Sequence, residues 1–297
     1  MKIMVTGASG LVGSKLVPLL QSDRHEVLTL TRRTPRYPSE RQWDPAGKLP
    51  PGTLDGVEAI VHLAGENIGD GRWTAAKKQR IRDSRVIGTR TLAEAAAATG
   101  GRVKTFVCAS AIGFYGNRGN EELKEDSAVG AGFLPDVCRE WEAATDPAKQ
   151  AGIRVVNLRL GVVMSREGGA LAKMLLPFKM CVGGIVGPGT QYWSWLTVDE
   201  AASMFRFAVQ NTELSGPVNA VTPQPVTNYE FTKTLGRVLG RPTLFPLPAF
   251  MARIVLGEMA DDLILGSTRV VPSRLQAAGY QFLHPEIEAA LNSAVQS

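Results

Sequence analysis

The sequence predicts an α/β protein built on a doubly wound parallel sheet, with a smaller lobe toward the C-terminus. Three observations support this fold class. Apolar segments of strand length alternate with amphipathic segments of helix length up to about residue 165. Several glycines lie between the first expected strand and the first expected helix. Beyond about residue 165 the alternation gives way to glycine-rich and aromatic stretches, which indicates a change of architecture.

The expected elements follow one another in strand–helix order. Strands are expected at residues 2–6, 26–32, 55–65, 104–111, 154–163 and 217–221, and helices at residues 11–23, 74–100, 134–150, 198–210, 229–240 and 285–295. Parallel strands that are joined by helices make right-handed crossovers, so we expect helices on both faces of the sheet.

Length, charge and cysteine content limit which kinds of protein and ligand the sequence is compatible with. The 297 residues correspond to about two lobes. Lysine and arginine total 33 and aspartate and glutamate 28, and this net charge of +5 suits an anionic ligand but does not predict nucleic-acid binding. Cys108, Cys138 and Cys181 are widely spaced and include no CxxC pair, which predicts no metal site and favours a reducing cytoplasm. Charged residues interrupt the longest apolar stretches, so no membrane-spanning segment is expected.

The glycines after the first strand predict a dinucleotide-binding loop. Gly7, Gly10 and Gly13 have the spacing G-x-x-G-x-x-G. Glycines there let the backbone turn tightly and approach a pyrophosphate, whose charge faces the helix N-terminus. Glycines also occur in ordinary turns, but the strand before them and the helix after them favour a dinucleotide-binding loop over an ordinary turn. The residues of this loop expected to line it are Gly7, Ser9, Gly10, Leu11, Val12 and Gly13.

The end of the second strand favours NADP(H) over NAD(H). The position about 20 residues beyond the last glycine, where an NAD-binding protein carries an acid, is Arg33, preceded by Arg32. Two arginines can bind a 2′-phosphate through charge-assisted hydrogen bonds. The alternative is a solvated basic turn. We expect residues 1–170 and 190–222 to form a Rossmann-type NADP-binding domain, and residues 171–189 and 223–297 to form the smaller substrate-binding lobe.

Several segments together resemble a known superfamily. VTGASGLVG, TRR, VHLAGEN, ASAIGFYG and WLTVDEAA occur in the order found in extended short-chain dehydrogenases/reductases, over nearly the whole chain. LAGENI, CREWEAA and RLQAAGYQFLHPEIEAAL are similar to the atypical, nucleoside-diphosphate-sugar epimerase-like branch of that group. The resemblance implies that Leu63, Ala64 and Gly65 line the cofactor and that Asp44 approaches the adenine.

The catalytic Ser-Tyr-Lys set of this superfamily is incomplete in the sequence. Tyrosine serves there as acid or base, lysine lowers the tyrosine pKa, and serine binds the reacting oxygen. The resemblance places Ala111, Leu134 and Cys138 at these three positions, and a one-residue shift of the helix gives Phe133 and Val137 instead. The standard Tyr-Lys pair is therefore predicted to be missing.

Two hydroxyls near the fourth long strand stay as candidates. We predict that Tyr115, helped by Ser110, supplies a proton if any side chain does, the alternative for Tyr115 being simple aromatic packing. A literal Y-x-x-x-K also occurs from Tyr229 to Lys233. It opens a helix in the expected substrate lobe, so we predict packing there and no catalytic role.

Three further residues are candidates for ligand contact. Arg85 replaces an asparagine of the family motif, and either contacts a cofactor or substrate phosphate or belongs to a solvated basic helix face. Gln191 and Trp193 follow a glycine-rich loop and are expected to contact substrate, whereas core packing between lobes is the alternative.

Two hypotheses about function follow. The first is an NADP(H)-dependent oxidoreductase or epimerase acting on a small, nucleotide-linked substrate in the cleft between the lobes. The second is a non-catalytic NADP(H)-binding regulator or scaffold protein. The glycine loop supports both equally, whereas the missing Tyr-Lys pair favours the second. Fold resemblance alone underlies the word epimerase, and neither the substrate nor the oligomeric state follows from the sequence.

Overall fold

The central sheet is formed by the apolar runs predicted as strands. A computed structural model describes residues 1–296. Seven strands lie in the order β3-β2-β1-β4-β5-β7-β11, and each neighbouring pair is parallel. They are β1 (Lys2–Thr6), β2 (Glu26–Thr31), β3 (Glu40–Gln42), β4 (Ala59–His62), β5 (Thr105–Ala111), β7 (Arg154–Leu160) and β11 (Gly216–Ala220). The doubly wound parallel fold is thereby confirmed.

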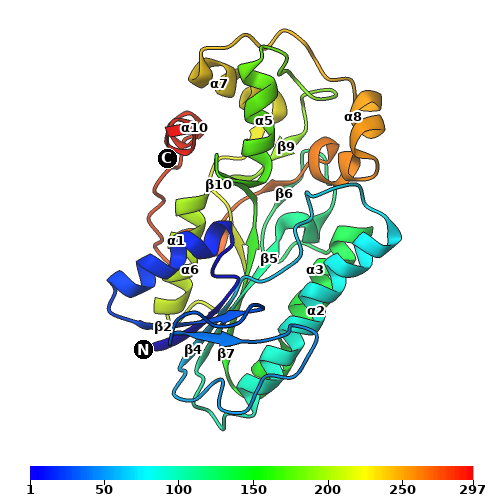
Figure 1. The fold of residues 1–297 in the computed structure, drawn as a ribbon. Helices are drawn as coiled ribbons and strands as arrows, with labels where there is room; N and C mark the ends of the chain where they lie inside the picture. Colours follow the sequence, from blue (N-terminus) through cyan, green and yellow to red (C-terminus); the bar gives the residue numbers. More distant parts are fainter. Residues whose placement is uncertain (297) are drawn as a thin grey trace.

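Helices cover both faces of this sheet (Figure 1). They are α1 (Leu11–Ser22), α2 (Ala75–Ala97), α3 (Phe133–Ala143), α4 (Asp146–Gln150), α6 (Val198–Gln210) and α9 (Ser273–Ala277). Helix α1 packs on α6, and α2 packs on α3 and α4. The helix expected at 134–150 is broken between α3 and α4, where the Thr145 hydroxyl donates to the Glu142 carbonyl at 2.6 Å and Pro147 follows.

The smaller lobe lies beyond one end of the sheet, at the top of Figure 1. It contains α5 (Gly169–Lys179), α7 (Asn228–Leu239), α8 (Ala249–Leu256) and α10 (Ile287–Gln296), with the short strands β8 (Val162–Met164), β9 (Tyr192–Trp193), β10 (Trp195–Thr197) and β12 (Val226–Thr227). The remaining elements are the 3-10 turn η1 (Ile112–Tyr115), β6 (Glu122–Leu123), the π-helical turn η2 (Asp261–Leu265) and β13 (Arg269–Val270).

The sheet and the lobe each have an apolar core, and a third, small cluster contains Tyr115 and Leu123. The larger lies around β1, β4, β5 and β7, and the second contains Trp193, Trp195 and Phe231. Trp193 and Trp195 therefore pack with the lobe, although the predicted domain division assigns residues 190–222 to the sheet domain. That division stays a prediction. No helix within residues 1–296 is both long and apolar enough to cross a bilayer.

The strand order reverses between β1 and β4. From β1 the chain proceeds outward through β2 and β3, and from β4 it proceeds the opposite way through β5 and β7. In open parallel sheets, such a reversal leaves a crevice outside the carboxyl ends of the strands, and ligands bind there. The glycine loop follows β1 directly and so lies at this crevice.

Candidate cofactor and active site

Two glycines allow the loop after β1 to pack closely. Gly7 has a φ of +69°, in the left-handed region that favours glycine. A Cβ on Gly7 would lie 2.8 Å from the carbonyl carbon of Leu63, and one on Gly13 would overlap the Gly7 carbonyl oxygen. The sequence places glycine where α1 and the turn after β4 both approach the loop backbone. This is the cradle expected of a dinucleotide site.

The N-terminus of α1 presents free backbone donors to the crevice. Gly10 is the N-cap and has no side chain, and the first helical hydrogen bond runs from Ser14 N–H to the Gly10 carbonyl at 2.9 Å. The amides of Leu11, Val12 and Gly13 accordingly have no acceptor within the helix. Ser9 and Gly10 are exposed. These donors, together with the helix dipole, fit the pyrophosphate of a dinucleotide.

The opposite wall of the crevice is the turn Leu63–Gly65 after β4. The Thr6 hydroxyl oxygen accepts the N–H groups of Leu63 and Ala64, both at 3.2 Å. The same hydroxyl lies 2.6 Å from Nδ1 of His62, to which it donates. This contact ties the ends of β1 and β4 together. Burial, reinforced by the charge of Arg85, lowers the pKa of His62 to about 3, so the ring is neutral.

Arg85 braces that turn from the α2 side. Its guanidinium donates to the carbonyls of Glu66 and Ile81, both at 3.1 Å, and stacks 5.0 Å from the ring of Trp141. A Cβ on Gly65 would lie 3.4 Å from the guanidinium carbon. Arg85 is thus held directly behind the turn expected to line the cofactor. Its contact with a phosphate stays a prediction.

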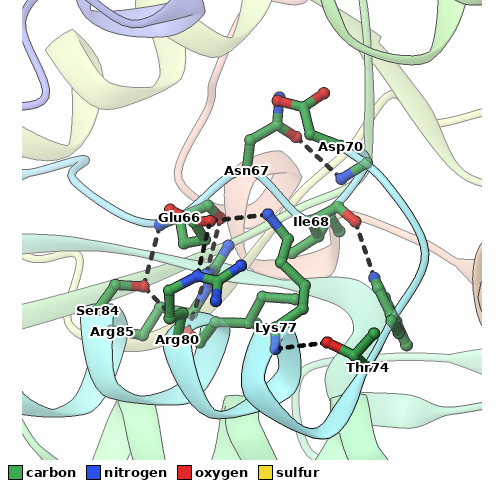
Figure 2. A network of polar contacts seen from close by, with 12 residues as sticks. Glu66, Asn67, Ile68, Asp70, Thr74, Lys77, Arg80, Ser84 and Arg85 are labelled. Atoms are coloured by element: carbon green, nitrogen blue, oxygen red, sulfur yellow. Dashed lines mark hydrogen bonds and ion pairs between the residues drawn. The ribbon is translucent and has the colours of Figure 1, made fainter.

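The residue after that turn is clamped by cations of α2. Figure 2 shows the Glu66 carboxylate between Lys77 and Arg80, with nitrogen–oxygen distances of 2.8 and 3.6 Å. The Glu66 N–H donates to the Ser84 hydroxyl at 3.0 Å. The hydrogen bond from Lys77 holds the pKa of Glu66 below its usual value. The start of the loop after Gly65 is therefore fixed to α2.

The rest of this loop, residues 66–74, reaches the smaller lobe. Lys173 of α5 donates to the Gly69 carbonyl and lies 3.3 Å from the Asp70 carboxylate. Arg72 donates to the carbonyls of Ile254 and Val255 at the end of α8. One loop thus connects the cofactor-side turn with two helices of the lobe.

The two arginines after β2 differ in their surroundings. Both are exposed, but Arg33 pairs with Glu40 of β3 at 2.6 Å, whereas the Arg32 side chain has no partner within residues 1–296. Arg32 is therefore the unpaired cation of the two, and contact of either arginine with a 2′-phosphate stays a prediction. Asp44 is exposed in the turn after β3, where it accepts the N–H of Ala46 at 3.0 Å.

Helix α3 carries a leucine and a cysteine at the positions where the superfamily has its Tyr and Lys. Leu134 and Cys138 of α3 face the turn η1, since a Cβ on Gly113 would lie 3.4 Å from Leu134 and 3.7 Å from Cys138. Burial raises the pKa of the Cys138 thiol to about 12. Leucine has no proton to transfer, and a thiol that is neutral at neutral pH carries no positive charge that would lower the pKa of a tyrosine.

A buried ion pair holds both candidate hydroxyls. Arg159 of β7, with 3% of its side chain exposed, donates two hydrogen bonds to Glu142 of α3 at 2.7 and 2.8 Å. Ser110 donates to the same carboxylate at 2.7 Å, and Arg159 donates to the Tyr115 hydroxyl oxygen at 2.9 Å. Tyr115 in turn donates to Asn219 at 2.6 Å.

Tyr115 consequently has no access to solvent. Its side chain is fully buried, and burial raises the pKa of its hydroxyl even though Arg159 acts in the opposite direction. Sequence reasoning did not identify Arg159 or Glu142 as part of this site. The available signal was an arginine near the end of the mostly apolar strand β7, and a glutamate on α3 four residues after the buried Cys138. The catalytic role of Tyr115 and Ser110 stays a prediction, and their placement favours a structural one.

The two substrate candidates lie inside the lobe. The Trp193 indole N–H donates to the Ile264 carbonyl at 3.2 Å and its ring packs on Phe231 at 5.1 Å. The Gln191 amide donates to the carbonyls of Val186 and Ile264, while its side-chain oxygen is buried with no hydrogen-bond partner among residues 1–296. Gln191 lines a cavity of about 510 Å³. Substrate contact by either residue stays a prediction.

The fold and the glycine cradle define a Rossmann-type dinucleotide-binding protein with a C-terminal lobe. Residues 3–221 match the NAD dependent epimerase/dehydratase family, and residues 247–294 match a domain of unknown function, DUF1731. The chain therefore belongs to the NAD dependent epimerase/dehydratase family.

Relatives and solved structures of similar sequence span the whole chain. Human epimerase family protein SDR39U1 is 36% identical over 300 residues, covering 99% of this chain and 100% of the human protein. Mycobacterium leprae epimerase family protein ML0860 is 42% identical over 293 residues, covering 98% and 95%. The crystal structure of human SDR39U1 (isoform 2) with NADPH superposes with a TM-score of 0.90 at 33% identity, over 100% of both chains.

Proposed function

We propose that the chain binds NADP(H) at the crevice between β1 and β4 and acts as an NADPH-responsive binding protein. One observation supports a binding role instead of a catalytic one. The hydroxyls of Ser110 and Tyr115 are both engaged by the Arg159–Glu142 pair and their partners. Within residues 1–296, the α3 positions that correspond to the superfamily's Tyr and Lys are Leu134 and Cys138, so no proton donor of that type is present there. The cofactor, when bound, would offer a hydride, but proton transfer at the substrate oxygen has no evident source.

Preference for the phosphorylated cofactor is attributed to Arg32. Its guanidinium is unpaired within the described chain, whereas Arg33 is neutralised by Glu40. The backbone amides that begin α1 would hold the pyrophosphate, and the turn at Leu63–Gly65 would line the other side. The presence of NADPH in the crystal structure of human SDR39U1, 33% identical to this chain, supports the assignment.

The loop at residues 66–74 supplies a route from the cofactor crevice to the smaller lobe. It begins at the turn that lines the crevice and ends at contacts with α5 and α8, through Lys173 and Arg72. Lys78 of α2 adds an ion pair to Glu258, just after α8. Cofactor contacts with the Leu63–Gly65 turn would therefore bias the position of α8, whose exposed apolar side chains include Phe250, Met251 and Ile254 and could meet a partner.

An oxidoreductase or epimerase acting on a nucleotide-linked small molecule is the competing function. The family name and the solved structure of a nucleoside-diphosphate sugar epimerase from Corynebacterium glutamicum support it. That structure superposes with a TM-score of 0.84 at 38% identity over 99% of this chain and 58% of the other. A catalytic function of this kind would require the Tyr115 side chain to leave its buried hydrogen bonds. A cytoplasmic location is likewise a prediction, consistent with three free cysteines.

Hydrogen–deuterium exchange with and without NADPH tests the proposal. We expect NADPH to slow exchange both in residues 63–74 and in α8. In Arg72→Gln, which removes the contacts to the end of α8, protection should persist in residues 63–74 and disappear from α8. Arg90→Gln, an equal charge change at an exposed position of α2, should behave like the wild type. Exchange in α8 that is indifferent to NADPH would contradict the proposed coupling.

A further inference from the structure

A second cavity, of about 650 Å³, lies on the outer side of α7. Its lining residues are Tyr229, Lys233, Gly236, Arg237, Gly240, Arg241, Pro242 and Thr243. Helix α7 belongs to the smaller lobe, remote from the glycine loop that begins α1 (Figure 1). The Y-x-x-x-K motif that the cofactor site does not use therefore forms part of a separate pocket.

The wall of this pocket is built by close packing. Gly240, at a φ of +62°, ends α7, and the Arg241 N–H returns to the Gly236 carbonyl at 2.9 Å. A Cβ on Gly236 would lie 2.6 Å from the Thr243 methyl group. Glycine at these two positions lets the turn at residues 240–243 fold back on the helix.

Four side chains recur every fourth residue along this side of α7 and into the turn. They are Tyr229, Lys233, Arg237 and Arg241. On α7 this spacing brings Tyr229, Lys233 and Arg237 to one face, and the turn after Gly240 places Arg241 in the lining of the same pocket. The pocket thus combines an aromatic ring with three cations.

Two of the three cations are not neutralised by an acid. Arg237 pairs with Glu288 at 3.0 Å. The Lys233 ammonium donates to the hydroxyl and carbonyl of Thr243 at 3.0 and 3.3 Å, and has no acidic partner within residues 1–296. Arg241 is exposed, and its guanidinium has no partner in the same part of the chain. Lys233 is thus oriented by neutral acceptors, which leaves its charge and that of Arg241 available to an anion.

The aromatic member of the set is available too. Tyr229 is 52% exposed, although it is a large side chain, and the Lys233 nitrogen lies 5.7 Å from its ring centroid. Such a ring can stack on a planar group of a ligand. The cavity volume is within the range of about 300–1,000 Å³ that is usual for small-molecule sites.

We propose that this pocket binds a phosphate monoester that carries a planar ring. Lys233 and Arg241 hold the phosphate, and Tyr229 stacks on the ring. The site is independent of the NADP(H) crevice, so cofactor and this ligand can be bound together.

Calorimetry on NADPH-saturated protein tests the site, with uridine 5′-monophosphate as the probe and uridine and inorganic phosphate as partial probes. The cofactor blocks nucleotide binding at the crevice. We expect uridine 5′-monophosphate to bind more tightly than inorganic phosphate, and uridine not to bind. Lys233→Gln and Arg241→Gln should each weaken binding about tenfold or more, and Tyr229→Ala should abolish the advantage over inorganic phosphate.

Matched control variants distinguish binding in this pocket from nonspecific attraction of an anion to a basic protein. Arg90→Gln removes one positive charge from the exposed side of α2 and should leave binding unchanged. Thermal midpoint and NADPH affinity should be the same in all variants, because the substituted side chains lie outside both cores. The proposal is overturned if the wild type does not bind uridine 5′-monophosphate, or if Lys233→Gln and Arg241→Gln bind it like the wild type.

Discussion

Replacing Glu142 by glutamine should destabilise the protein far more than a typical surface change. The substitution leaves the Arg159 guanidinium in a site where 3% of its side chain is exposed, and replaces two charge-assisted hydrogen bonds at 2.7 and 2.8 Å by neutral ones. Breaking a buried pair by removing one partner costs about 3–5 kcal/mol. Because 13% of the Glu142 side chain is exposed, we expect the lower end, about 3 kcal/mol.

Urea unfolding monitored by tryptophan fluorescence measures this cost. Glu140→Gln on the same helix is the matched control. Glu140 pairs with Arg82, and their side chains are 29% and 49% exposed, respectively. Loss of this exposed pair should lower the free energy of unfolding by less than about 1 kcal/mol. The double variant Arg159→Met with Glu142→Leu should lose less than Glu142→Gln alone, because no buried charge is left unpaired. A loss below about 1 kcal/mol in Glu142→Gln, or a double variant that is less stable than Glu142→Gln, would refute the reasoning.

Three further outcomes are expected. In calorimetry, Arg32→Ala should weaken NADPH binding about tenfold or more and leave NADH binding unchanged. Arg33→Ala should weaken NADPH binding less, because Arg33 pairs with Glu40. A larger loss in Arg33→Ala than in Arg32→Ala would contradict the proposed role of Arg32. The folded pKa of His62 is lowered from 6.5 to about 3, so the unfolded state takes up a proton first as the pH falls. Stability should therefore decrease by up to about 1.4 kcal/mol per pH unit below about pH 6, and His62→Gln should remove that part of the slope. Gly13→Ala should abolish NADPH binding and lower the thermal midpoint, since its Cβ overlaps the Gly7 carbonyl; retained affinity would contradict the cradle geometry.

The elements with strong local signals were predicted from the sequence. The strands at the centre of the sheet are apolar and the glycine spacing is fixed by close packing, so both are visible in the residue order. Strand β3 was missed because Glu40–Gln42 is a short polar strand at the edge of the sheet. The break between α3 and α4 was missed because a single hydroxyl contact at Thr145 and the following proline decide it.

The candidate site was only partly predictable, because its deciding contacts join residues far apart in the chain. The absence of a tyrosine and a lysine on α3 is a property of the sequence alone. The pairing of Arg159 with Glu142, and the contact of Arg159 with Tyr115, bring together β7, α3 and η1. No local pattern could show that the two candidate hydroxyls are already engaged.

Single-turnover oxidation of bound NADPH tests the central claim that this site lacks a usable proton donor. The wild type and Tyr115→Phe are mixed with a panel of aldehydes, ketones and keto-sugar nucleotides, and the nicotinamide absorbance is followed. The predicted result is tight NADPH binding by both proteins and no oxidation faster than that of free NADPH. Rapid oxidation by the wild type, whether or not Tyr115→Phe retains it, would contradict the account, and its loss in Tyr115→Phe would identify the buried tyrosine as the proton donor.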